Sequence, residues 1–246
     1  IKKAQRKGHK VFVCTGRARS QVGASIKDIG FDGYIYSAGT VVEVGKQLVH
    51  SDQLDEQMVW EIVEILEERG LGYILEGYEN SYYDERAAGY FTSLHNNVDA
   101  TEESITFLNE LSIKPMSEFK MGVMINKLCF FAYNNEEIMA VKAIYGSKVD
   151  FMIHEYDGST MIAAELTLPG INKASGMDVV LAYCAASLEQ TIGLGDSRND
   201  MEMIAHAHLG ISMGNGIEAL KEIANDVTDT LENDGVYKAF EKHGLF

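Results

Sequence analysis

Residues 191–204 constrain the fold of this chain more than any other stretch. They open with an apolar run typical of a buried parallel strand, break into a polar turn after Gly195, and resume a helical pattern at Met201 and Ile204. The pattern predicts a strand, an acidic loop and a helix. In open α/β sheets ligands bind at the loops that follow the carboxyl ends of strands, so this loop is the first candidate site.

Three side chains with oxygen ligands crowd that loop: Asp196, Asn199 and Asp200. Clustered oxygen ligands of this kind suit a hard cation such as Mg²⁺. The alternative is a capped turn, because Asp and Asn are favoured in turns and Asp200 could cap the following helix. We favour the metal site and keep the cap as the structural alternative.

A second strand–loop–helix unit lies near the start of the chain. Residues 10–14 predict a strand, Thr15-Gly16-Arg17 follow it, and a helix is expected over about residues 18–29. A hydroxyl at a strand end, followed by a glycine and the free N–H groups of a helix start, makes an anion site. Thr15 could instead act only as a helix cap.

Residues 51–165 have a different character. Helical spacing predicts helices over residues 55–69, 101–111 and 135–145. Paired strands are expected at residues 123–125 with 128–133 and at residues 149–155 with 160–168, while residues 76–97 show no clear period. Such a mix is typical of an α+β domain. After it the α/β pattern returns, with a helix expected from about residue 177. We therefore expect a domain of residues 1–50 and 166–246 that carries an inserted domain of residues 51–165.

Composition excludes some classes of partner. The formal net charge is -16, which argues against binding of nucleic acid or an anionic membrane, because both need a basic surface. A phosphorylated small molecule remains compatible, since a bound metal can reverse the field inside one cleft. The scattered cysteines, Cys14, Cys129 and Cys184, are expected to be buried thiols in a reducing compartment. No segment predicts a membrane span or a signal peptide, so we expect a cytoplasmic monomer or homodimer.

Three pieces stand in a fixed order: Thr15-Gly16-Arg17, Lys173 after Pro169-Gly170, and the loop from Gly195 to Asp200. With the position of the insert, this set resembles the haloacid dehalogenase-like hydrolases, and within them the Cof-type phosphatases with an α/β cap (class IIB). The resemblance implies an α/β, Rossmann-like core with a parallel sheet and an inserted α+β cap. It also implies a Mg²⁺-dependent phosphatase that hydrolyses a small phosphorylated metabolite, such as a sugar phosphate, through an aspartyl-phosphate intermediate.

The resemblance also implies a role for each residue. Thr15 would bond the phosphoryl oxygens, Gly16 and Arg17 would lend backbone N–H groups, and Lys173 would neutralise charge on the nucleophile and the phosphoryl group. Asp196 would hold Mg²⁺ directly and Asp200 through water or by orienting Lys173, while Asn199 would bond a phosphoryl oxygen or that lysine. These residue types suit phosphoryl transfer, which depends on positioning and charge stabilisation. Lys173 could otherwise be an ordinary solvated lysine.

The family's first motif, an apolar strand ending Asp-x-Asp-Gly-Thr, has no counterpart before Thr15. A similar run at residues 155–160 comes after the insert, and its Asp157-Gly158 pair is a hairpin signal, so we reject it as the nucleophile. Without that central strand we expect two half-sheets with open apolar edges, and we expect the chain to be part of a longer, active protein. The alternatives are a sugar phosphomutase-like phosphotransferase and a non-catalytic protein that binds a phosphorylated ligand.

Overall fold

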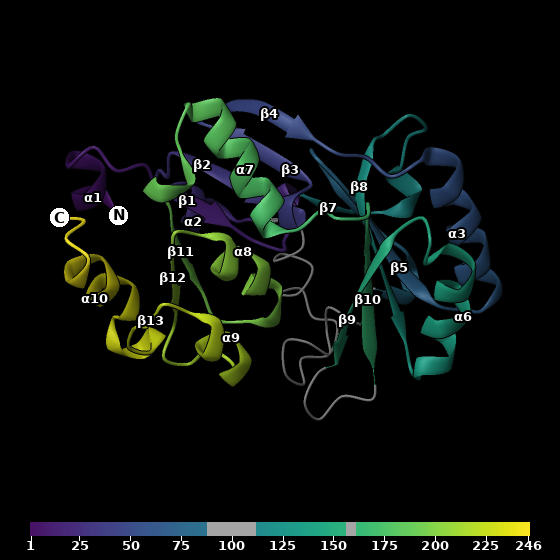
Figure 1. Cartoon of the computed structure of the whole chain (residues 1–246). Coiled ribbons are helices and arrows are strands. Elements are labelled where there is room, and N and C mark those ends of the chain that lie inside the picture. The colour runs from purple at the N-terminus through teal and green to yellow at the C-terminus, as the bar shows by residue number, and fades with distance from the viewer. Residues whose placement is uncertain (88–111, 156–160) are drawn as a thin grey trace. The chain divides into compact units, whose positions relative to one another are not determined.

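The computed structural model describes residues 1–87, 112–155 and 161–246. The chain groups into two compact units (Figure 1), the first made of residues 1–16, 28–50 and 171–246 and the second of residues 17–27 and 51–170. The mixture of parallel strands and helices confirms the α/β class. Residues 17–27 group with the second unit, whereas we had placed them in the core; the division into a core and a cap stays a prediction. Among the described helices, none has both the length and the apolarity that a bilayer span requires.

The first unit contains two sheets. In the four-stranded sheet, β1 (Phe12–Cys14) pairs in parallel with β2 (Gly33–Tyr36), and β3 (Val41–Val44) and β4 (Gln47–Ser51) follow. The three-stranded sheet is parallel and consists of β11 (Ile192–Gly195), β12 (Leu209–Ser212) and β13 (Asp226–Val227). Strands β1 and β11 are both at a sheet edge, as expected for two half-sheets, and Ile192 on β11 is exposed.

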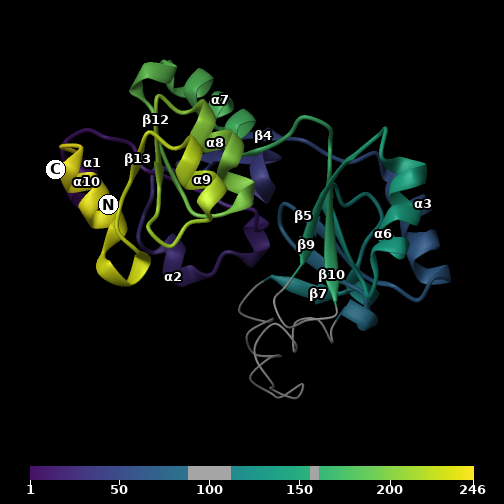
Figure 2. The ribbon, with the colours of Figure 1, turned by 60° about the horizontal axis from the view of Figure 1, so that its bottom comes forward.

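The helices of the first unit are α1 (Lys2–Arg6), α7 (Lys173–Cys184), α8 (Met201–His206), α9 (Glu218–Ile223) and α10 (Gly235–Lys242). Helix α7 packs on β2 and β3 through Ile35, Val42 and Val180, and α8 packs on α9 through a second apolar cluster. Cys14 of β1 contacts both clusters. Helices α1 and α10 lie side by side (Figure 2), with the Lys3 ammonium 5.5 Å from the ring of Tyr237.

The second unit is built on a six-stranded sheet. In sheet order the strands are β7 (Ile113–Pro115), β6 (Ser81–Tyr83), β5 (Gly72–Gly77), β8 (Ile125–Ala132), β10 (Ile162–Thr167) and β9 (Asp150–Glu155). Helices α3 (Glu56–Glu68) and α6 (Asn135–Tyr145) cover one face of this sheet (Figures 1 and 2). Alternate strand residues such as Leu75, Leu128 and Leu166 meet the helices in one apolar core. The expected α+β composition of residues 51–165 is therefore present among the described residues.

Several expected elements differ from the structure. Residues 123–125 and 128–133 do not pair, because residues 125–132 form the single strand β8. The helix expected over residues 18–29 is reduced to a 3-10 helix (Arg19–Gln21) and the short α2 (Ala24–Lys27), separated by the extended residue Val22. The polar residues of this segment bond to strands instead: Ser20 Oγ lies 2.6 Å from Ser81 Oγ, and Gln21 donates to Glu76.

The start of α7 and two short strands also differ from the expectation. Helix α7 begins at Lys173, not near residue 177, because Asn172 and Ser175 cap it there. Strands β6 and β7 were not expected, since their short sequences carry no clear period. The helix expected at residues 101–111 and the Asp157-Gly158 turn lie outside the described residues. All three cysteines are free; Cys129 is buried as expected, whereas Cys14 and Cys184 are half-buried.

The sheet face turned away from α3 and α6 carries a buried ion cluster. Lys127 Nζ lies 3.2 Å from Glu76 and 3.1 Å from Glu165, and both Lys127 and Glu76 are buried. Burial alone would raise the pKa of Glu165, but the Lys127 cation outweighs burial and lowers that pKa to about 2. For Glu76 burial outweighs the same cation, and its pKa is raised. The Lys127 ammonium therefore offsets the cost of burying the carboxyl groups of Glu76 and Glu165 in the sheet.

We expect Lys127→Met to lower the free energy of unfolding by about 3–5 kcal/mol, because it leaves two carboxylates without their cation. Lys114→Met is the matched control, since Lys114 forms an exposed pair with Glu118 at 3.9 Å and is expected to cost at most about 1 kcal/mol. Urea unfolding of both variants measures the difference. Equal losses would show that the Lys127 cluster contributes no more than a surface pair.

The lowered pKa of Glu165 also predicts an acid limb. A carboxyl whose folded pKa is about 2, against an ordinary 4.5, contributes stability that is fully present above pH 4.5 and is lost as the pH falls toward 2. The contribution of Glu76 changes above pH 4.5, because its pKa is raised. We expect the free energy of unfolding of Glu165→Gln, measured with urea, to change less between pH 4.5 and pH 2 than that of the wild type. A profile parallel to that of the wild type would contradict this assignment.

Candidate active site

Lys173 is the first residue of α7, and its side chain is buried. Its Nζ lies 2.5 Å from Asp200 Oδ1 and 2.9 Å from Asn199 Oδ1. The helix begins here because the Asn172 side chain accepts from the backbone N–H groups of Ala174 and Ser175. At 5% exposure, Lys173 is not a solvated surface lysine. The Asp200 carboxylate that faces it offsets the unfavourable placement of a cation at a helix start.

Asp200 closes the loop after β11. One oxygen, Oδ1, takes the Lys173 ammonium, and Oδ2 accepts from the backbone N–H groups of Asp196 and Ser197 at 3.0 Å and from Ser197 Oγ. Asp200 makes no side-chain cap to α8, so that part of the cap alternative is wrong. The turn itself is capped, because the Asp200 side chain forms a capping box with Ser197 around the 3-10 helix Arg198–Asp200. A Cβ on Gly195 would lie 2.6 Å from the Asp200 side chain, so only glycine fits that position.

Asp196 presents the exposed carboxylate of the loop. Its side chain is approached only loosely by Asn215 Nδ2, at 3.4 Å from Oδ2, and the residue is exposed. Its backbone N–H is held by Asp200, so the position of the residue is set while its carboxylate stays accessible. This is the arrangement expected of a group that binds a ligand from solution.

The loop after β1 lies beside the Asn199 side chain of the loop after β11. A Cβ added to Gly16 would lie 3.2 Å from Asn199 Nδ2, which places the Thr15–Gly16 backbone against that side chain. The Thr15 N–H donates to the carbonyl of Ile35, so the residue continues the β1–β2 pairing into the loop. The first unit therefore gathers most of the predicted site residues around one loop: Thr15, Gly16, Lys173, Asp196, Asn199 and Asp200. Arg17 groups with the second unit, and its role stays a prediction.

Ser197 is a site residue that the sequence reasoning missed. Its hydroxyl donates to Asn199 Oδ1 at 2.8 Å and to Asp200 Oδ2 at 3.1 Å, so it aligns both groups that hold Lys173. Serine at this spacing before an Asp is the signal for such a local turn. The Asn215 side chain accepts from the Leu231 N–H, and its amide nitrogen lies 3.4 Å from Asp196 Oδ2.

The loop offers one carboxylate that is free to bind a cation. Among the described residues there is no group of three or more His, Cys, Asp or Glu that could enclose a metal, and both Asp200 oxygens already accept hydrogen bonds. Mg²⁺ usually keeps several waters and takes one or two carboxylates together with substrate phosphate. The exposed Asp196 fits that pattern, and Asp200 fits the role of orienting Lys173.

Cys14 lies beside this network at the end of β1. Loss of solvation raises the pKa of its thiol to about 12, although the Lys173 cation opposes the shift. The thiol therefore stays protonated at neutral pH, which disfavours a role as nucleophile.

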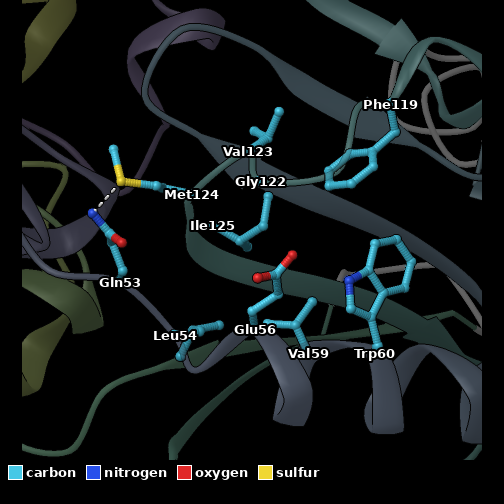
Figure 3. A pocket seen from close by; sticks show the side chains of 10 residues that line it. All are labelled: Gln53, Leu54, Glu56, Val59, Trp60, Phe119, Gly122, Val123, Met124 and Ile125. Carbon is cyan, nitrogen blue, oxygen red and sulfur yellow. Dashed lines mark hydrogen bonds between the residues drawn. The ribbon is translucent and has the colours of Figure 1, made fainter.

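A separate pocket of about 130 Å³ lies within the second unit (Figure 3). Leu54, Val59 and Ile125 are its buried apolar wall, and the rings of Trp60 and Phe119 meet edge to face at 5.2 Å. The exposed Glu56 is its one charged lining residue. None of the predicted site residues lines this pocket, so it is distinct from the loop site.

Comparison with known proteins identifies the family. The family model described as haloacid dehalogenase-like hydrolase matches residues 1–240. The chain belongs to the haloacid dehalogenase-like hydrolases. This match confirms the resemblance to the Cof-type hydrolases. Among solved structures, the HAD subclass IIB sugar phosphatase BT4131 is similar to this chain in fold, with a TM-score of 0.74 and 24% identity over 100% of this chain and 89% of that one.

Two relatives from Bacillus subtilis (strain 168) show how the likeness is distributed. The protein YkrA is 26% identical over 246 residues, which is 100% of this chain and 88% of YkrA. The 5-amino-6-(5-phospho-D-ribitylamino)uracil phosphatase YitU is 42% identical over 79 residues, or 32% of this chain and 29% of YitU. The identity to YitU is thus higher than that to YkrA, but it is confined to a shorter stretch of this chain.

The two aspartates of the loop are expected to differ in their effect on folding. Asp200→Asn removes the counter-charge of buried Lys173 and should lower the free energy of unfolding by about 3 kcal/mol or more. Asp196→Asn changes an exposed group and should alter it by less than about 0.5 kcal/mol. Chemical unfolding of both variants at pH 7 checks the contrast. A reversed order would contradict the roles that the geometry gives these side chains.

Proposed function

We propose that this enzyme is a Mg²⁺-dependent phosphatase that hydrolyses a small phosphorylated metabolite, such as a sugar phosphate, in the reducing interior of the cell. The observation that carries the proposal is the buried Lys173 ammonium, held by Asp200 and Asn199 beside the Thr15–Gly16 loop and the exposed Asp196. A fixed cation, backbone N–H groups at a loop and an accessible carboxylate are the parts that phosphoryl transfer requires. The relative YitU is named as a phosphatase of a phosphorylated ribityl compound, which supports a substrate of this class.

Each residue has a distinct task in this proposal. The Thr15 hydroxyl and the Gly16 and Arg17 N–H groups bind the phosphoryl oxygens, and Lys173 stabilises the charge that builds up on them. Asn199 accepts from Lys173 through Oδ1 in the structure, and its Nδ2 would donate to a phosphoryl oxygen. Asp200 accepts from the lysine ammonium and so holds it in position. These groups are positioned before substrate arrives, so little reorganisation is needed during the reaction.

Asp196 would hold Mg²⁺ through its exposed carboxylate, and Asp200 would assist through water or by orienting Lys173. Such an ion supplies positive charge that neutralises the phosphoryl group and orients it. The aspartate that accepts the phosphoryl group in the proposed intermediate belongs to the family's first motif, which is not among these 246 residues. Its attack on phosphorus would break the ester P–O bond and release the alcohol, and water would then attack the phosphorus, release phosphate and regenerate the carboxylate.

A panel of phosphate esters tests the proposal on the protein purified as its gene encodes it. We expect phosphate release that needs Mg²⁺ and stops with EDTA, and we expect Asp196→Asn to lower kcat at least about 100-fold, because it removes the anionic ligand. Asp178→Asn is the matched control, since Asp178 is exposed and pairs with His206 on the surface; its kcat should stay within about twofold.

Other outcomes separate the alternatives. Transfer of the phosphoryl group within one sugar, without release of phosphate, would favour a phosphomutase-like phosphotransferase. Binding of phosphate esters without turnover by the wild type would favour a non-catalytic binding protein. If no ester in a broad panel yields Mg²⁺-dependent phosphate, the hydrolase proposal fails.

A further inference from the structure

The most strained backbone among the described residues is the turn at residues 37–40, between β2 and β3. Ser37 and Ala38 have φ values of 46° and 56°, and Gly39 follows with φ 118°. Two consecutive non-glycine residues in the left-handed region are uncommon, and each costs free energy unless its surroundings impose it. The buried Thr40 hydroxyl has no hydrogen-bond partner in the described part of the chain, which adds a further cost. Such a concentration of unfavourable features needs a reason.

The turn contacts both loops that form the site. On one side, the Ala38 N–H donates to the Thr15 carbonyl at 3.0 Å, so the turn holds the backbone of the proposed phosphate-binding loop. On the other side, a Cβ added to Gly39 would lie 2.1 Å from the Asn172 carbonyl oxygen. Asn172 is the residue that caps α7 and sets Lys173 as its first residue. The turn is therefore wedged between the Thr15 loop and the start of the lysine helix.

The contact continues one turn further along α7. A Cβ added to Gly176 would lie 3.1 Å from Gly39 Cα and 2.5 Å from the side chain of Ile35. Glycine thus stands on both sides of the same close approach, which leaves no side chain between the turn and the helix. A turn with ordinary φ values would present Cβ atoms or a different path at this point and hold α7 farther away.

We propose that the strained turn of residues 37–40 is a positioning element that sets the distance between the Thr15 loop and the Lys173 ammonium. Gly39 is its key positioning residue, because its backbone is the surface on which the cap of α7 rests. The effect on catalysis rests on the proposed phosphatase function. The effect on the placement of Lys173 does not, and it has a readout of its own.

The test uses Gly39→Ala with Gly45→Ala as the matched control. Gly45 lies in the β3–β4 hairpin with φ 63° and has nothing within 4 Å of an added Cβ, so the control carries a left-handed backbone cost, smaller than that at the Gly39 φ of 118°, without the clash. Gly39→Ala should push the Asn172 carbonyl and Lys173 away. We expect kcat to fall at least about tenfold, since misplacing a reacting group by about 1 Å can cost far more, with the folded fraction by circular dichroism matched to that of the control.

The second readout is the rate at which acetic anhydride modifies Lys173, followed by mass spectrometry of the peptide. In the wild type this lysine is 5% exposed and should react slowly. We expect labelling about fivefold faster in Gly39→Ala and unchanged in Gly45→Ala. If Gly39→Ala does not fold, Gly176→Ala widens the same contact from the helix side and should shift both readouts in the same direction.

The outcomes are distinguishable. If the wild type hydrolyses no ester, the proposed function fails, while the labelling rates still decide whether the turn positions Lys173. If Gly39→Ala matches Gly45→Ala in both kcat and labelling, the positioning role is overturned. A fall in kcat without faster labelling also overturns it, because Lys173 would not have moved.

Discussion

The pairing of Lys173 with Asp200 is the interaction on which the loop site depends. It joins the first residue of α7 to the loop after β11, two segments that are separated by 27 positions in the chain. The second oxygen of Asp200 accepts from the backbone N–H groups of Asp196 and Ser197. The same carboxylate therefore positions both the Lys173 ammonium and the loop that carries the exposed Asp196. A buried ion pair contributes little net stability when compared with apolar residues. Its retention here is better explained by the geometry that it imposes.

The two units each contain a buried lysine, and the contrast shows what a functional setting requires. Lys127 lies within a strand between two carboxyl groups, which neutralise its charge. Lys173 faces one carboxylate and one amide at the end of strands, next to a glycine loop and an exposed acid. Lys173 is balanced by a single carboxylate, whereas Lys127 faces two, so the Lys173 site adds less negative charge to repel the phosphoryl group that we propose to bind there. Burial and position, more than residue type, separate a structural lysine from a candidate catalytic one.

Much of the site follows from local sequence. The apolar run before Gly195 predicts a strand, the acids after it predict a ligand-binding loop, and Lys173 lies shortly before a predicted helix. The structure brings these pieces together. The prediction was less successful where local pattern and tertiary contacts compete. Residues 18–29 have helical spacing, yet Ser20 and Gln21 bond to neighbouring strands and the helix shortens to Ala24–Lys27. Strands β6 and β7 are too short to leave a period that could be recognised.

The sequence by itself determined the class of fold, the family and the set of polar residues at the strand ends, because apolar periodicity and the order of motifs are properties of neighbouring residues. Tertiary structure decided how those residues share their hydrogen bonds: that Asp200 faces Lys173 and its own loop instead of capping α8, and that Asp196 stays accessible. It also decided that the turn at residues 37–40 adopts a strained path against Asn172. These outcomes depend on contacts between segments distant in the chain, and the free energy of such contacts cannot be read from either segment alone.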